Sequence, residues 1–271
     1  MEEVIEFLTI QFQSGLGYDS LNTARGALSS IGLNFDGFKA GSHPLVVRFM
    51  KGVFALRPSQ PRYSAVWDVN QVLTYLRKFS PMKEISLKDL TLKLTMLMAL
   101  TQAARVQTLQ LITLDGCKKL KTEFVFRLNS LLKLSRTSCR ASVLSFIAYP
   151  PDRRLCVYTV LKEYLFRARN VRKDDIDNKM LLVSYVKPYK PVTRDTISRW
   201  IKTVMMRSGI NVSEYGSHSV RAASTSKARS VCVPMKDILL RAGWSNVGTF
   251  AKFYDKEIHS QEDRFQAGVL Q

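Results

Sequence analysis

The sequence is poor in cysteine and histidine, with four cysteines and three histidines among 271 residues. The cysteines lie far apart and form no CxxC pair; they are Cys117, Cys139, Cys156 and Cys232. Zinc sites need closely spaced ligands, and disulfide frameworks need many cysteines in a short chain. We therefore expect neither, predict no metal or other cofactor, and favour a reducing compartment.

Long apolar runs are also missing from the sequence. No stretch approaches the length of about 20 apolar residues that a membrane-spanning helix needs. The first residues, "MEEVIEFLTIQF", are acidic and then amphipathic, whereas a signal peptide is basic and then apolar. We expect an intracellular protein with no membrane partner.

Acidic residues are scarce relative to basic ones. The chain has 41 Lys and Arg against 22 Asp and Glu, a net charge of +19. This excess is spread along the whole sequence. A dispersed cationic excess on a folded protein is typical of a polyanion partner, most often nucleic acid. The alternative is a basic soluble protein with no such partner.

The patterning predicts a mainly α protein with a small antiparallel β-sheet. Residues 1–80 are expected to form a domain of short helices, because apolar residues recur at helical spacing between turn signals. Residues 81–86 are expected to be a linker. Beyond it, Ser86 and Asp89 form a capping box before a helix too apolar to be exposed.

Residues 87–271 are expected to be the second domain. The segments "EFVFRLN" and "ASVLSFIAY" are rich in β-formers and are separated by the basic "SLLKLSRTSCR". They predict an antiparallel hairpin. Helical periodicity returns from "RRLCVYTVLKEYLFRA" onward.

Five side chains in this second region could handle a phosphate. Ser217 is a plausible N-cap, which places His218 and Arg221 on one helical face. Arg105 ends a buried apolar helix, where a charge is costly unless it meets an anion or a partner. "RAGWSNVGTFAKFY" adds Trp244 and Tyr254. An isolated HxxR is weak evidence, since most such pairs lie on a solvated helix face.

Together, these groups form a phosphate-handling set without metal ligands. Guanidinium groups bind nonbridging phosphate oxygens through paired N–H groups and stabilise a pentacoordinate transition state. A tyrosine hydroxyl has a pKa of about 10, so as a nucleophile it needs proton removal and cationic neighbours. The chemistry predicted is covalent phosphoryl transfer to a phenol oxygen, which conserves bond energy for rejoining a strand.

This order of motifs resembles the tyrosine recombinases, also called phage-integrase-like recombinases. The resemblance rests on "AARVQTL", the basic hairpin, "HSVR" and "AGWSNVGTFAKFY", and it covers essentially the whole chain. The last motif is similar to the Trp-containing motif of the Cre recombinase. Details of "AARVQTL" and "AGWSNVGTFAKFY" look most like recombinases of eukaryotic mobile elements of the DIRS, Ngaro or Crypton kind.

The resemblance implies a role for each residue. Arg105 and Arg221 would hold the phosphate, His218 would be the base or position the proton, and Trp244 would donate a hydrogen bond. Tyr254 would be the nucleophile. The hairpin would supply a general acid: Lys133 is favoured because Arg is a poorer acid at neutral pH, and Arg136 is the rival.

Two positions depart from the family pattern. Thr108 stands where many members have an acidic residue that supports the first arginine, although a threonine can still hydrogen-bond. The step from Trp244 to Tyr254 is ten residues, one more than is usual, so Phe253 occupies the expected place. Only Tyr254 has a hydroxyl, and an extra residue in the "SNVG" turn would restore the geometry.

The resemblance also implies an architecture and an activity. Residues 1–80 would be a SAM-like core-binding domain and 87–271 the catalytic domain. Residues 255–271 would be a helix that is either exchanged between protomers or packed on its own subunit. The activity would be site-specific recombination of double-stranded DNA through a 3′-phosphotyrosine and a Holliday junction, by a dimer on one site and a tetramer in synapsis. A protein of a eukaryotic element would be nuclear, and otherwise cytoplasmic or nucleoid-associated. Alternatives are a catalytically silent, domesticated DNA-binding protein and a type IB topoisomerase-like nicking-closing enzyme.

Overall fold

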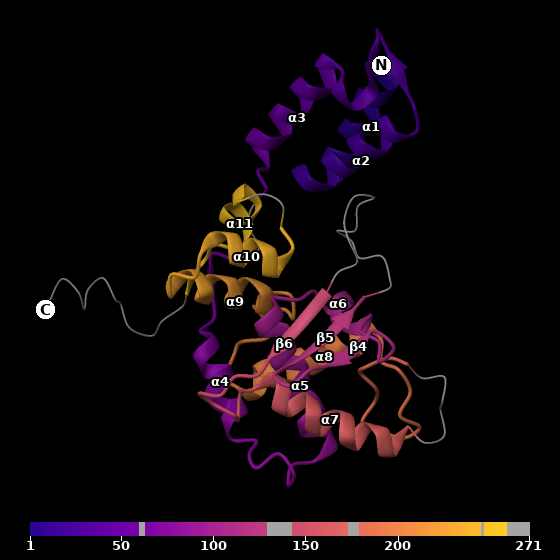
Figure 1. Cartoon of the computed structure of the whole chain (residues 1–271). Helices are drawn as coiled ribbons and strands as arrows, with labels where there is room; N and C mark the ends of the chain where they lie inside the picture. Colours follow the sequence, from indigo (N-terminus) through magenta and orange to yellow (C-terminus); the bar gives the residue numbers. More distant parts are fainter. Residues whose placement is uncertain (60–62, 129–142, 173–178, 245–246, 259–271) are drawn as a thin grey trace, which may run out of the picture. The chain divides into compact units, whose positions relative to one another are not determined.

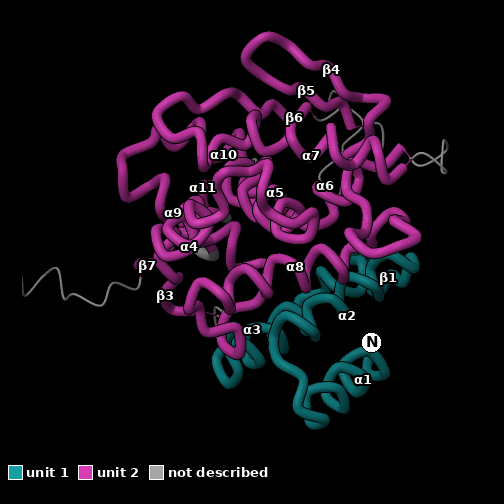
Figure 2. Tube along the Cα trace, turned by 90° about the horizontal axis from the view of Figure 1, so that it is seen from below, with its two compact units in different colours: residues 1–62 teal, residues 63–271 magenta. Residues whose placement is uncertain are grey.

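The computed structural model describes residues 1–59, 63–128, 143–172, 179–244 and 247–258. The chain divides into two compact units, Met1–Arg62 and Tyr63–Gln271, which are coloured separately in Figure 2. Both are mainly helical, and the sheets are small, as the sequence predicts. In the described part of the chain, no helix has the length and apolar character needed to cross a membrane.

Unit 1 is a small helical unit with its own apolar core. It contains α1 (Glu2–Gln13), α2 (Tyr18–Ser30) and α3 (Pro44–Leu56). A small hairpin and a 3-10 turn connect the last two helices. The hairpin has two strands of two residues, β1 (Asn34–Phe35) and β2 (Phe38–Lys39), and the turn is η1 (Ala40–Ser42). The side chains buried between the helices are Val4, Leu8, Leu21, Val46, Met50 and Val53.

Unit 2 is built around one buried helix, α5 (Leu87–Gln102), which lies in the middle of this unit in Figure 2. Helices α7 (Val157–Val171), α8 (Arg194–Arg207) and α9 (Ser219–Ser230) pack against it. The Ser86 hydroxyl accepts a hydrogen bond from the Asp89 amide and donates one to the Asp89 carboxylate, which confirms Ser86 as the N-cap of α5.

The predicted hairpin is part of a three-stranded antiparallel sheet. Strands β4 (Cys117–Lys119), β5 (Glu123–Arg127) and β6 (Val143–Ile147) lie in sequence order, with Phe124 opposite Phe146 (Figure 1). The buried rings of Phe124, Phe126 and Phe146 join the core of unit 2. Burial alternates along β5: Phe124 and Phe126 are buried, while the other residues of the strand are partly or fully exposed.

The remaining elements of unit 2 are short. They are β3 (Ala65–Val66), α4 (Val69–Arg77), α6 (Val106–Gln110), α10 (Met235–Ala242), α11 (Val247–Phe253) and β7 (Glu257–Ile258). Strand β7 pairs in parallel with β3. A helix was expected over 255–271, but the first part of this range contains a strand, and the rest lies outside the described residues.

The boundary between the units differs from the one expected at residue 80. Helix α4 belongs to unit 2, because its apolar face of Val69, Val72 and Leu76 is buried in the core of that unit. The stretch 81–86 is thus a loop inside unit 2 and does not link domains. Arg167 of α7 fixes this loop by hydrogen bonds to the carbonyls of Met82, Lys83 and Ile85.

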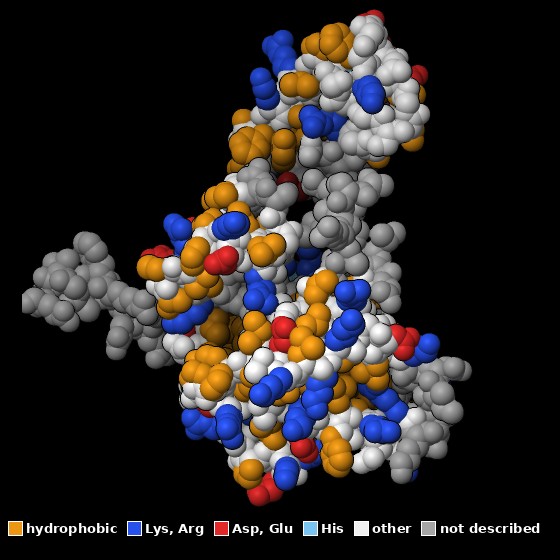
Figure 3. Space-filling view, in the orientation of Figure 1, with side chains coloured by type: hydrophobic (Ala, Val, Ile, Leu, Met, Phe, Trp, Pro, Cys, Tyr) orange, Lys and Arg blue, Asp and Glu red, His pale blue; other side chains and the backbone are white. Residues whose placement is uncertain are grey.

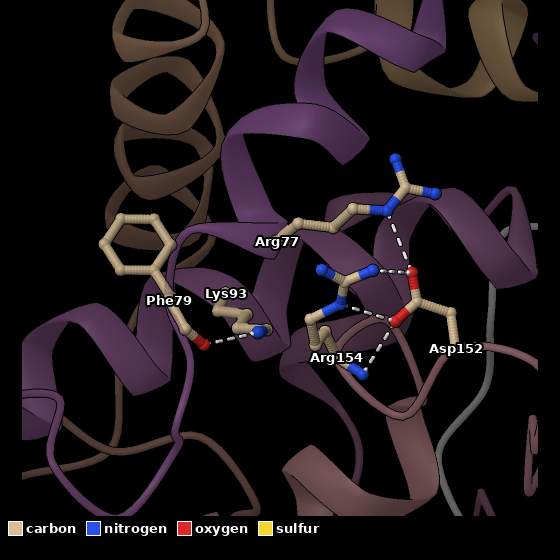
Figure 4. A network of polar contacts seen from close by, with 5 residues as sticks. All are labelled: Arg77, Phe79, Lys93, Asp152 and Arg154. Atoms are coloured by element: carbon tan, nitrogen blue, oxygen red, sulfur yellow. Dashed lines mark hydrogen bonds and ion pairs between the residues drawn. The ribbon is translucent and has the colours of Figure 1, made fainter.

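A lysine is buried beside a small network of polar side chains in unit 2. Lys93 of α5 is fully buried, and its ammonium donates a hydrogen bond of 2.7 Å to the Phe79 carbonyl. Nearby, the Asp152 carboxylate accepts hydrogen bonds from Arg77 and Arg154 (Figure 4). Burial lowers the pKa of Lys93 to about 8, although Asp152 acts in the opposite direction.

Candidate active site

Arg221 is the centre of the site. It lies on α9 with 6% of its surface exposed. Its Nη1 donates to the Ala103 carbonyl at 2.7 Å, and its Nη2 donates to the Ala242 carbonyl at 2.5 Å. These two bonds fix the plane of the guanidinium and leave one hydrogen on each Nη for another acceptor.

Both carbonyls lie at the C-terminal ends of helices. Ala103 caps α5 in a left-handed conformation with a φ of 44°, and Ala242 is the last residue of α10 before the left-handed Gly243. The C-terminal end of a helix carries partial negative charge from its free carbonyls. Two helix ends therefore stabilise this buried guanidinium in a place where an unpaired charge would be costly.

Trp244 and Tyr254 pack beside the same guanidinium. The Arg221 Cζ lies 4.4 Å from the centre of the Trp244 ring and 5.6 Å from that of the Tyr254 ring. The two rings are 4.3 Å apart between centroids, and Trp244 also contacts the buried Phe250. A cation over an aromatic face is attracted by the ring quadrupole. The ten-residue step thus still brings Tyr254 to Trp244 and Arg221.

Backbone hydrogen bonds fix the position of Tyr254. It follows α11, and its amide donates to the Phe250 carbonyl at 2.8 Å. Its own carbonyl accepts from the Ser226 hydroxyl at 2.8 Å, and the same hydroxyl accepts from the Lys256 amide at 3.1 Å. Since Ser226 is on α9, the helix that carries Arg221 also positions the chain around Tyr254.

Arg105 is within electrostatic reach of Arg221. It is half-buried at the N-cap of α6, directly after the turn that follows α5. Burial, with the Arg105 charge as the next cause, lowers the pKa of Arg221 to about 10, and the Tyr254 phenol partly offsets this. Arg221 therefore remains a cation at neutral pH, and its guanidinium lies beside the phenol ring of Tyr254.

His218 occupies a different place from the one expected. It is itself the N-cap of α9, where Ser217 was expected, and its side chain makes no capping bond. Its carbonyl accepts from the Arg221 amide at 3.2 Å. The imidazole is exposed, and within the described residues it makes no hydrogen bond. The turn thus places the imidazole in solvent, while Arg221 is buried.

Three other expectations have different outcomes. Lys133 and Arg136 both lie outside the described residues, so the choice between them stays a prediction. Thr108 is half-buried on α6. In the described part of the chain, its hydroxyl makes no hydrogen bond to Arg105.

The sequence gives little sign of the residues that hold Arg221 and Tyr254. Ala103 and Ala242 act through their carbonyls, which every residue has, and Ser226 is one of several serines along α9. Gly243 marks the end of α10 in the sequence, but the sequence does not show which side chain contacts the end of that helix.

Basic side chains recur over the visible face of unit 2 (Figure 3).

Solved structures of other proteins resemble this fold. No family model and no curated protein matches the sequence. Among solved structures, the XerH site-specific recombinase bound to palindromic difH substrate in a post-cleavage complex is similar, with a TM-score of 0.63 and 10% identity over 98% of this chain and 70% of that chain. The Tn1549 transposon integrase in complex with transposon right end DNA has a TM-score of 0.60 and 14% identity, over 99% and 84%.

Two more structures extend this likeness. The XerA recombinase has a TM-score of 0.52 and 16% identity, over 98% of this chain and 89% of that chain. A lambda integrase dimer bound to a COC′ core site also has a TM-score of 0.52, with 14% identity over 97% and 81%. The likeness covers both units and the elements that carry Arg221, Trp244 and Tyr254. This chain therefore has the tyrosine recombinase fold.

Proposed function

We propose that this chain is a site-specific DNA recombinase that cuts and rejoins DNA through a covalent bond to Tyr254. The observation that carries the proposal is the contact of one buried, doubly anchored arginine, Arg221, with both Trp244 and Tyr254. The fold adds support, because its solved neighbours are recombinases and integrases, several of them bound to DNA. The charge of +19 suits a polyanionic substrate.

In the proposed reaction, Arg221 and Arg105 bind the nonbridging oxygens of the scissile phosphate. The Tyr254 oxygen attacks phosphorus, an O–P bond forms, and the bond from phosphorus to the 5′ oxygen breaks. The products are a 3′-phosphotyrosine and a free 5′-hydroxyl. Since one phosphoester replaces another, a 5′-hydroxyl can reverse the step without ATP.

Two protons have to move in this reaction. The phenol proton leaves Tyr254, with His218 as its acceptor or as the group that positions it, and the nearby cations lower the energy of the phenolate. The 5′ oxygen gains a proton from the hairpin, from Lys133 or its rival Arg136. The Trp244 indole N–H would donate a hydrogen bond to the phosphate.

The finer assignment extends the same proposal. Exchange would proceed by two rounds of cleavage around a Holliday junction, in a tetramer assembled from dimers on two DNA sites, with residues 255–271 contacting a neighbouring protomer. The motifs favour a mobile element of the DIRS, Ngaro or Crypton kind. The protein would then work in the nucleus without a metal ion.

The test uses nicked DNA that traps the covalent intermediate. Duplexes selected by binding from random sequence would be nicked just 3′ of each candidate phosphate, so that the short fragment carrying the new 5′-hydroxyl is lost after cleavage. We expect a protein–DNA adduct that survives denaturation with the wild type and with Tyr149→Phe, an exposed tyrosine, but not with Tyr254→Phe.

The outcomes separate the alternatives. An adduct that persists in Tyr254→Phe would refute the assigned nucleophile. Binding without any adduct would favour the silent DNA-binding protein. An adduct accompanied by relaxation of supercoils, without strand exchange between two sites, would favour the topoisomerase-like enzyme.

A further inference from the structure

A second contact joins α5 and α10 beside Arg221. The Arg241 Nη1 of α10 donates a hydrogen bond of 3.0 Å to the Gln102 Oε1 of α5, across 139 positions of sequence. The Gln102 Nε2 in turn donates to the Ser145 carbonyl of β6 at 2.7 Å. Gln102 is 4% exposed, and both the oxygen and the nitrogen of its buried side-chain amide are hydrogen-bonded.

This contact joins the two helix ends that hold Arg221. Gln102 directly precedes Ala103, and Arg241 directly precedes Ala242; these two alanines supply the carbonyls that bind the Arg221 guanidinium. The ends of α5 and α10 are therefore joined twice. One connection is the hydrogen bond between Gln102 and Arg241, and the other is Arg221, which bonds to a carbonyl at each end. The sheet anchors this arrangement, since Ser145 lies within β6.

The geometry makes the position of the guanidinium depend on this link. Two acceptors on different helices fix the guanidinium plane only while the helix ends keep their separation. Helix α10 has only eight residues, and Arg241 lies in its last turn, next to the carbonyl that binds Arg221. A displacement of about 1 Å at a group that binds a transition state can slow a reaction about a hundredfold.

We infer that Gln102 and Arg241 are positioning residues for Arg221. They set the separation of the α5 and α10 ends and thereby the direction of the Arg221 N–H groups. The consequence for catalysis rests on the proposed function, whereas the effect on the Arg221 environment does not. An exposed arginine of a basic protein could instead bind a DNA phosphate directly, and the test separates these roles.

The test compares Arg241→Met with Lys236→Met. Lys236 is exposed on the same helix and makes no hydrogen bond through its ammonium within the described residues, so both variants lose one charge. At saturating protein, we expect Arg241→Met to slow single-turnover adduct formation by about 10- to 100-fold and Arg241→Lys to restore part of the rate. Lys236→Met should stay within about twofold of the wild type.

A substrate with a methylphosphonate at the scissile position supplies the second readout. The methyl group replaces a charged nonbridging oxygen, so the placement of Arg221 matters less to its cleavage. The slowing caused by Arg241→Met should therefore be clearly smaller on the methylphosphonate than on the phosphodiester. Equal slowing on both substrates, or none on either, would overturn the inference.

A third readout needs no DNA cleavage. The Nε–H signal of Arg221 in nitrogen-labelled protein, identified by its loss in Arg221→Lys, should shift and exchange faster in Arg241→Met and Gln102→Met but not in Lys236→Met. An unchanged signal would refute the positioning role. A shifted signal in a protein whose wild type forms no adduct would refute the proposed function and keep the positioning role.

Discussion

The indole nitrogen of Trp67 donates a hydrogen bond of 2.9 Å to the hydroxyl of Ser219, although the two residues are 152 positions apart. Both are buried. The Ser219 hydroxyl in turn donates a hydrogen bond of 2.7 Å to the Gly216 carbonyl. The start of α9, next to His218, is thereby fixed to the segment between β3 and α4.

Replacing Trp67 by Phe should destabilise unit 2 by about 2–3 kcal/mol, because a buried hydrogen bond and part of a ring are lost together. Trp200→Phe is the matched control: Trp200 is also buried, and in the described chain its indole nitrogen makes no hydrogen bond. It should cost about 1 kcal/mol less. Urea unfolding of both variants measures the difference, and equal losses would show that the bond contributes nothing.

Trp244→Ala should lose stability, whereas Trp244→Phe should lose mainly the rate of adduct formation. The alanine variant removes a ring packed on Phe250 and Tyr254 and should cost about 3–5 kcal/mol of unfolding free energy. The phenylalanine variant keeps a ring beside Arg221 but no N–H donor. We expect nearly normal stability with adduct formation slowed about tenfold or more, and partial recovery in Trp244→His. A normal rate in Trp244→Phe would exclude the donor role.

Ser226→Ala should slow adduct formation about 10- to 100-fold, because two hydrogen bonds that place the chain around Tyr254 are lost together. Ser230→Ala is the control, since Ser230 is exposed on the same helix and, within the described residues, its hydroxyl bonds only to the Lys227 carbonyl. DNA affinity should be unchanged in both variants, as measured by titration at fixed salt. If Ser226→Ala reacts at the wild-type rate, the Tyr254 backbone needs no such support.

The pKa of Lys93 predicts a rise of stability with pH. Burial lowers this pKa from 10.5 to about 8 in the folded state. Between these values, the unfolded chain binds more protons than the folded one, so stability increases with pH in that window and the gain is absent below about 8. After discount for solvent near the ammonium, the gain is about 1–2 kcal/mol.

The check is urea unfolding at pH 7 and pH 10. Relative to Lys93→Met, the wild type should become more stable at the higher pH. Lys162→Met, which removes an exposed lysine of α7, controls for the loss of one cation. A stability difference between the wild type and Lys93→Met that is the same at both pH values would contradict the shifted pKa.

The sequence predicted much of the local structure, because local structure is encoded in short-range patterns. The N-cap at Ser86, the β5–β6 hairpin and the end of α10 at Gly243 follow from residue types at fixed spacings. It also predicted that Arg221, Trp244 and Tyr254 belong together, and the structure brings these three into contact.

The boundary between the units and the cap of α9 could not be predicted in this way. The amphipathic face of α4 is equally compatible with either unit, and only packing assigns it to unit 2. Ser217 is a good N-cap by residue type, yet the turn before α9 buries it and leaves His218 at the cap. In both cases, long-range contacts outweigh a local preference.

By itself, the sequence determined the helical class, the cationic charge and the identity of the side chains that can handle a phosphate, since these depend on composition and spacing. Only the tertiary structure decided what holds those side chains in place. The Ala103 and Ala242 carbonyls and the link from Gln102 to Arg241 join residues from 21 to 139 positions apart. Every residue has a backbone carbonyl, so residue types do not show which carbonyl accepts a hydrogen bond. That is decided only when folding brings the helix ends together.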